Sequence, residues 1–239
     1  PQQTPSRPRT AATSTYGQIL KSSALVGGSS FVNVAAGMVR SKAFAVLLGP
    51  AGFGLMGVYW SIVNFAESIA GLGVNTAGVR QIAAASGSGE SERVVRTARV
   101  LRRTSLALGL LGAAGLAVLS GPVSRLTFGS DEHALPIALL SLAVLFRTVG
   151  AGQGALIQGL RRIGDLARSG VIGGIFGTVA SIALVFAFRE GGVVMSVIAT
   201  EGAFLLLAWW FSRKVAVAAI PVPLGEMGRE AGALLKLGF

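Results

Sequence analysis

The chain has 239 residues, of which 52% are hydrophobic and 13% are charged, whereas an ordinary soluble domain carries about 25% charged residues. It contains no cysteine and one histidine, which excludes a disulfide framework and argues against thiolate or multi-histidine metal sites. The net charge of +11 fits the basic cytoplasmic loops of a membrane protein better than nucleic-acid binding, because of how the basic residues are distributed.

Six apolar stretches are long enough to cross a bilayer, which takes about 20 helical residues. They run over about 19–48, 54–78, 104–124, 134–160, 169–188 and 191–212. Gly and Pro in the short connections, as in residues 49–52, signal helix ends. The predicted fold is an all-α integral membrane protein. Six transmembrane helices occupy residues 16–215, a disordered polar tail occupies 1–15, and a cytoplasmic connection occupies 216–239.

Basic residues gather on one side of this predicted bundle. Fourteen Lys and Arg fall in the N-terminal segment, the second and fourth connections and the exit of the sixth helix, whereas the opposite side holds Arg125 and Arg189. By the positive-inside rule, the N-terminus is expected in the cytoplasm. Before the third stretch, arginines recur with helical spacing, which predicts a helix with a basic face. That face either contacts anionic lipid head groups or only sets the topology: Arg93, Arg96, Arg99 and Arg103.

Charged residues also interrupt the apolar stretches, where each costs about 2.5–3.5 kcal/mol on insertion scales. They are Arg40, Lys42, Glu67, Arg147 and Glu201. Helical spacing aligns them with polar or small residues, and the clearest such stripe is Arg147, Ala151, Gly154 and Gln158. Similar stripes add Asn33 and Asn64 as candidates, with Asn75, Gln153 and Gln158 as weaker ones.

Two interpretations of these charges stay open. In one, acidic and basic residues pair and lock the bundle. In the other, they line a hydrophilic cavity for an anionic head group, and the surplus of three cations over two anions favours this role for Arg40, Lys42 and Arg147. Glu67 and Glu201 are then salt-bridge partners, a cation site or protonatable coupling groups.

The remaining polar and aromatic residues suggest no covalent chemistry. The sequence has no zinc-protease motif, Walker A loop or nucleophile elbow, so we expect neither an enzyme nor a metal or cofactor site. His133, beside Asp131 and Glu132, is predicted to be solvated in an outer loop. Trp60, Trp209 and Trp210 are predicted to be packing or interfacial aromatics.

Two segments carry a family resemblance. Residues 40–54, RSKAFAVLLGPAGFG, resemble the first hairpin of Wzx-type polysaccharide flippases, of the multidrug/oligosaccharidyl-lipid/polysaccharide exporter superfamily. Residues 158–165, QGLRRIGD, are similar to that family's fourth connection. The resemblance extends over nearly all of residues 16–239. Its last ten residues look like the start of a seventh helix, so the chain is expected to be an N-terminal lobe fragment.

The resemblance implies one lobe of a two-lobe exporter in the bacterial inner membrane. Such a protein flips undecaprenyl-pyrophosphate-linked oligosaccharide by alternating access, for O-antigen or other surface polysaccharide biosynthesis. Arg40 stands where lipid II flippases of the superfamily carry a cavity arginine, and Lys42 where Wzx proteins carry a lysine. The implied partners are the lipid-linked glycan, the bilayer and polysaccharide polymerase machinery, without nucleic acid.

Other functions remain as alternatives. Within the superfamily these are a drug/cation antiporter, which would favour acidic cavity residues, and a lipid II flippase. Outside it they are a membrane glycosyltransferase, for which the outer loop at residues 129–133 is short, and a non-transporting membrane scaffold.

Overall fold

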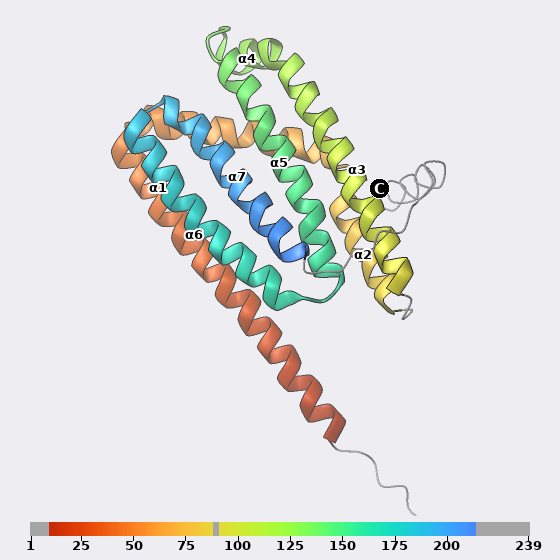
Figure 1. The fold of residues 1–239 in the computed structure, drawn as a ribbon. Helices are drawn as coiled ribbons and strands as arrows, with labels where there is room; N and C mark the ends of the chain where they lie inside the picture. The colour runs from red at the N-terminus through yellow and green to blue at the C-terminus, as the bar shows by residue number, and fades with distance from the viewer. Residues whose placement is uncertain (1–9, 88–90, 214–239) are drawn as a thin grey trace, which may run out of the picture.

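The computed structural model describes residues 10–87 and 91–213, and throughout these ranges the regular structure is α-helical (Figure 1). The helices are α1 (Thr10–Gly71), α2 (Val74–Gly87), α3 (Ser91–Val118), α4 (Ser120–Phe128), α5 (Ala134–Gly159), α6 (Ile163–Phe188) and α7 (Gly191–Ser212). The predicted all-α fold is therefore confirmed. Most of the predicted polar tail and the whole predicted connection at 216–239 lie outside the described residues, while residues 10–15 belong to α1.

A sharp kink divides α1 into a first arm (residues 10–48) and a second arm (residues 50–71). Gly49 forms the kink with φ 69° and ψ −174°, a backbone conformation that is essentially restricted to glycine. Pro50 follows, and its lack of an N–H suits the first turn of the second arm. The predicted connection at residues 49–52 is thus a kink rather than a loop.

Five of the described helices are long and apolar enough to cross a membrane. They are Val26–Gly71, Glu92–Val118, Ala134–Gly159, Ile163–Phe188 and Gly191–Ser212. The first has 46 residues, twice what a span requires, because it contains both arms of α1. The six predicted stretches therefore correspond to five continuous helices, of which the first is bent.

Two predicted boundaries are wrong. The second stretch was expected to reach Gly78, but it ends at Gly71 because Leu72 and Gly73 adopt positive φ before α2 begins. The third stretch was expected over 104–124, but α3 ends at Val118 and a separate α4 follows. At its other end α3 starts at Ser91, so the predicted helical extension with its arginines is confirmed. Hydropathy finds apolar residues and does not detect a turn among them.

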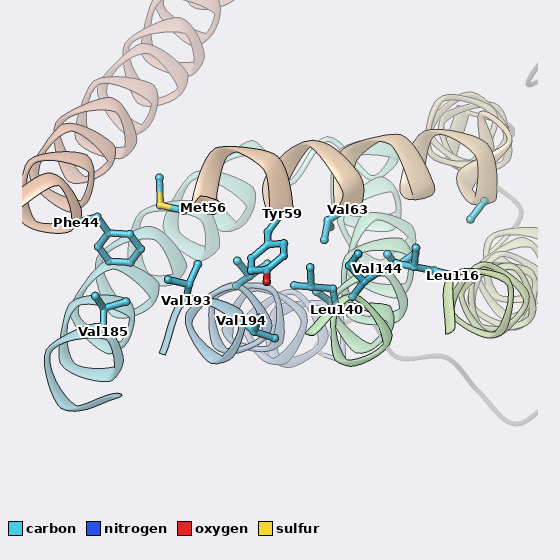
Figure 2. Close-up of a cluster of buried hydrophobic side chains, with 14 residues drawn as sticks. Phe44, Met56, Tyr59, Val63, Leu116, Leu140, Val144, Val185, Val193 and Val194 are labelled. Carbon is cyan, nitrogen blue, oxygen red and sulfur yellow. The ribbon is translucent and has the colours of Figure 1, made fainter. Parts of the chain in front are cut away.

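The second arm crosses the bundle and covers its main apolar core. The first arm lies beside α6, and the second arm passes behind α7 and α5 towards α3 (Figure 1). Tyr59 and Val63 on the second arm point towards valines and leucines of α7 and α5, while Met56 extends towards the side of the core where Phe44 lies (Figure 2). This packing fixes the rotation of the second arm, and therefore the direction of its polar residues.

Candidate functional site

A polar cavity of about 570 Å³ lies within the helical bundle. Its walls come from the first and second arms of α1 and from α2, α5, α6 and α7. Small residues of α5 and α6 form much of the wall, and the polar lining consists of Asn33, Glu67, Asn75, Arg147, Gln158, Thr200 and Glu201. A second cavity of about 200 Å³ adjoins it and shares Glu67 and Asn75.

Arg147 joins two carboxylates in this cavity. Its Nη1 donates a hydrogen bond to Glu201 Oε1 across 3.2 Å, and its Nε lies 3.8 Å from Glu67 Oε2. The Glu201 side chain is 8% exposed, whereas those of Arg147 and Glu67 are 31% and 27% exposed. The three groups come from α5, α7 and the second arm of α1, so the ion cluster ties three spans together.

Trp60 brings a second arginine to the same place. The Arg40 Cζ lies over the Trp60 ring at 5.5 Å from its centroid, and the Arg147 Cζ lies at 5.9 Å from the same centroid. Both distances are within the range of cation–π attraction, about 6 Å. Arg40 comes from the first arm, so Trp60 is a contact between the two arms of α1 and α5.

This cluster is balanced in charge, with Arg40 and Arg147 against Glu67 and Glu201. The surplus of one positive charge among the five charged residues of the apolar stretches therefore comes from Lys42. Lys42 is exposed on the first arm and is not part of the cavity lining. Pairing of acidic and basic residues and formation of a cavity are both present, although the sequence argument treated them as alternatives.

Asn33 reaches the cavity from the first arm because α6 opposes it with glycines. A Cβ at Gly174 would overlap Asn33 Oδ1, and a Cβ at Gly170 would lie 3.6 Å from Asn33 Nδ2. The side chain thus rests against a face of α6 that carries no side chains. Gly170 and Gly174 therefore leave the space on α6 that the Asn33 side chain occupies.

The predicted stripes differ in how much of each reaches the cavity. All four residues of the α5 stripe, Arg147, Ala151, Gly154 and Gln158, line it. On the second arm Glu67 lines it, but Asn64, one turn earlier, is exposed and is not part of the lining. Asn33, Arg147, Glu67 and Glu201 are thus brought together in the lining. Arg40 is not part of the lining and lies beside it through the shared contact with Trp60, whereas Lys42 and Asn64 lie apart.

Gln153 belongs to a different polar network, outside the cavity lining. Arg102 Nε donates to Gln153 Oε1 across 3.1 Å, and Arg102 Nη2 donates to the carbonyl of Ser212 across 3.2 Å. The Ser212 hydroxyl donates to Gln153 Oε1 across 2.7 Å. This network joins α3 and α5 to the last residue of α7.

His133 lies in the connection between α4 and α5, as predicted, but it is half-buried rather than solvated. Its ring stacks on Phe128 at a centroid separation of 4.0 Å, and its Nδ1 shares a 2.9 Å hydrogen bond with the hydroxyl of Tyr59. The helix α4, which was not predicted, folds the outer connection back onto the second arm. Beside it, Arg125 donates a hydrogen bond to Asp131, which lowers the pKa of that exposed carboxyl.

Sequence reasoning missed one polar residue of the cavity lining, Thr200, and one residue beside the cavity, Trp60. The sequence predicts Trp60 as a packing or interfacial aromatic, and the one available signal of another role is its position seven residues before Glu67, two helical turns along the same face. Thr200 was not considered, although it directly precedes Glu201. Among the described residues no group of three or more His, Cys, Asp and Glu side chains is arranged to hold a metal ion.

The chain is similar in sequence to one protein family and to two named proteins. Residues 19–218 match the family described as "Polysaccharide biosynthesis protein". The "Lipid III flippase" proteins of Escherichia coli (strain K12) and Shigella flexneri are each 27% identical to the chain over 191 residues. That alignment covers 80% of this chain but 43% of each relative, so the chain spans less than half the length of these proteins.

Two solved transporter structures share the fold. One is a MOP superfamily transporter from Pyrococcus furiosus, with a TM-score of 0.60, 19% identity, and coverage of 91% of this chain and 51% of that chain. The other is an outward-facing multidrug resistance MATE family transporter of the same superfamily, with a TM-score of 0.58, 20% identity, and coverage of 90% and 50%. The chain therefore has the fold of one lobe of such a two-lobe transporter, as predicted. These relatives are flippases and transporters, in agreement with the expectation that the chain is not an enzyme.

Proposed function

Since the chain belongs to the polysaccharide biosynthesis protein family, we propose that it serves to flip a polyprenyl-pyrophosphate-linked oligosaccharide across the bacterial inner membrane. The similarity to lipid III flippases, proteins named for a lipid-linked cargo, supports this class of substrate. The transport is non-covalent and uses alternating access, in which two lobes rock about a central site.

The observation that carries the proposal is the charge cluster in the polar cavity. Ionisable side chains within a membrane-spanning bundle are costly and mark substrate or ion pathways. Here Arg147 is held by two carboxylates, and Arg40 is held by the face of Trp60. A cation–π contact needs no carboxylate partner, so we expect the N–H donors of Arg40 to be available to phosphate oxygens. We therefore assign Arg40 as the first cation to meet the pyrophosphate, with Arg147 following when its carboxylates release it.

Other parts of the proposed path are less central. Asn33 supplies an amide to the sugar side of the cavity, and Lys42 and Asn64 face a surface that the second lobe of a complete exporter would cover. Glu67 and Glu201 keep Arg147 in place and are the groups at which a coupling ion or proton would act. O-antigen, enterobacterial common antigen and lipid II precursors all present the same pyrophosphate, so the residues that contact the sugar would select the glycan. Polysaccharide polymerase machinery is a further proposed partner.

The test is transport by the full-length protein in a strain that lacks its own flippase. Arg40→Ala is expected to reduce glycan export about tenfold or more, since a charged hydrogen bond contributes about 1.5–3 kcal/mol. Arg40→Lys should retain part of the activity, because the charge remains. Arg125→Ala removes an exposed arginine outside the cavity and is the matched control. Export by Arg40→Ala equal to that of the parent protein would refute the assignment.

The proposal includes a cytoplasmic N-terminus, and the lack of cysteine makes this testable. Single cysteines at Glu132, in the connection between α4 and α5, and at Ser86, near the end of α2, lie at opposite ends of the bundle in this scheme. A membrane-impermeant maleimide added to intact spheroplasts should label Glu132→Cys and spare Ser86→Cys. The reverse labelling would invert the proposed orientation.

A further inference from the structure

Trp60 is a contact that Arg147, which lines the cavity, shares with Arg40, which lies beside the cavity. The ring lies on the second arm, and it meets Arg40 from the first arm and Arg147 from α5 within 6 Å of one centroid. These arginines are separated along the chain by α2, α3 and α4, so the indole brings together two cations that the sequence keeps far apart. Packing alone does not require that two of the groups around an aromatic ring be guanidinium groups.

The orientation of this ring is fixed by its neighbour in the helix. Tyr59 is 2% exposed and is anchored in the main core, where it points towards α5 and α7 (Figure 2). Trp60 is partly buried and packs on the edge of the same core. The next residue along a helix is rotated by about 100°, so a rotationally fixed Tyr59 also fixes the direction of the Trp60 side chain. The side chain therefore leaves the second arm in a defined direction, and its ring lies within 6 Å of both guanidinium groups.

Electrostatic attraction explains why both guanidinium groups lie close to the same indole ring. Two guanidiniums in a poorly solvated region repel one another, whereas the negative face of an indole attracts each of them. Glu201 and Glu67 add negative charge on the Arg147 side. The result is a pair of cations that are both held within 6 Å of the centroid of one indole ring.

We propose that Trp60 is a positioning residue that holds Arg40 and Arg147 at the spacing needed to engage a diphosphate. This inference rests on the proposed function and adds a specific recognition element to it. A diphosphate carries two phosphoryl groups, and two guanidiniums at fixed separation contact both, whereas a single one contacts mainly one. The indole does not touch the ligand. It removes the conformational freedom that both arginines would otherwise lose on binding.

The test is binding of a probe that has the diphosphate but no sugar. Geranylgeranyl pyrophosphate is titrated against the full-length protein in detergent, with geranylgeranyl monophosphate as the comparison ligand. Trp60→Leu removes the aromatic face and should weaken diphosphate binding about threefold to thirtyfold, the range that corresponds to cation–π energies. Trp60→Phe retains a weaker face and should lie between Trp60→Leu and the parent protein. Monophosphate binding should change less than diphosphate binding.

Two further variants separate positioning from general damage to the fold. Trp209→Leu makes the same chemical change at a ring that contacts Arg213 outside the cavity, and it should bind the probe like the parent protein. In an Arg40→Ala background, Trp60→Leu should have less than half of its effect on log Kd, because coupled residues are not additive. If Trp60→Leu folds poorly, the Trp60→Phe series gives the same comparison.

The outcomes distinguish this inference from the function on which it rests. If Arg40→Ala weakens diphosphate binding while Trp60→Leu and Trp60→Phe do not, the role of Trp60 is refuted and the proposed function stands. If Arg40→Ala and Arg147→Gln also leave diphosphate binding unchanged, the proposed substrate class is refuted. Equal losses for diphosphate and monophosphate in Trp60→Leu would refute the spacing argument.

Discussion

Glu201 on α7 accepts a hydrogen bond from Arg147 on α5 across 3.2 Å, over a sequence separation of 54 residues. The two partners differ in burial, since the Glu201 side chain is 8% exposed and that of Arg147 is 31% exposed. Arg147 also has Glu67 at 3.8 Å, so it keeps a partner if Glu201 is neutralised. The pair is therefore asymmetric, because the buried carboxylate depends on the arginine more than the arginine depends on it.

This asymmetry predicts unequal effects of two neutralising substitutions. Arg147→Gln leaves Glu201 as a buried charge and should destabilise the protein by about 2–4 kcal/mol, near the range for one-sided loss of a buried ion pair. Glu201→Gln should cost less, since Arg147 retains Glu67. Thermal unfolding in detergent measures both, with Arg125→Gln, in an exposed ion pair, as a control without a measurable effect. Equal losses for the two variants would contradict the asymmetry.

The charge cluster also shows what the sequence could and could not predict. Helical spacing correctly grouped Arg147 with Ala151, Gly154 and Gln158, because these residues lie on one helix and share one face. The same rule grouped Asn64 with Glu67, of which the structure brings only Glu67 to the cavity. Periodicity identifies a face, but the neighbours of that face are set by packing of the second arm through Tyr59 and Val63.

Backbone geometry was likewise only partly predictable. Gly49 and Pro50 predicted a change in the direction of the chain, and the kink in α1 lies at Gly49. Leucine rarely adopts a positive φ, so the sequence does not predict the turn at Leu72. The predicted end of the second arm, at Gly78, therefore lies seven residues beyond the observed end at Gly71. The burial of His133 could not be predicted for a related reason, since its partners Phe128 and Tyr59 are brought to it by α4 and by the crossing of the second arm.

The network at the end of α7 gives a second prediction. Arg102 donates to Gln153 and to the carbonyl of Ser212, both of which are buried. Arg102→Met keeps an unbranched but shorter side chain and removes the donor to the Ser212 carbonyl and one of the two donors to Gln153, so it should destabilise the protein by about 1–3 kcal/mol. Arg93→Met makes the same change at an exposed position on α3 and should have little effect on thermal unfolding. Similar melting temperatures for the two variants would show that the network adds no stability.

The glycine face of α6 gives a third prediction. Gly174→Ala places a methyl group where Asn33 Oδ1 lies, and the exposed end of that side chain can move away. We expect a change in stability of less than about 1 kcal/mol, because no backbone has to shift. Glycan export should nevertheless fall to the level of Asn33→Ala, since the amide leaves the cavity. Gly54→Ala, where a Cβ meets no atom within 4 Å, is the control. Additive losses in the double variant of Asn33 and Gly174 would contradict a shared cause.

The hydrogen bond between Tyr59 and His133 gives the last prediction. Tyr59→Phe preserves the ring that packs in the core and removes only the hydroxyl, so it should cost about 0.5–1.5 kcal/mol. His133→Leu should cost more, because it also loses the stacking on Phe128. Thermal unfolding of both single variants and the double variant isolates the hydrogen bond as a coupling of about 0.5–1.5 kcal/mol. A coupling near zero would mean that the hydroxyl and the imidazole are each satisfied separately. In that case α4 would be held on the second arm by the aromatic contacts among Tyr59, Phe128 and His133, and Phe128→Leu would then carry the larger loss.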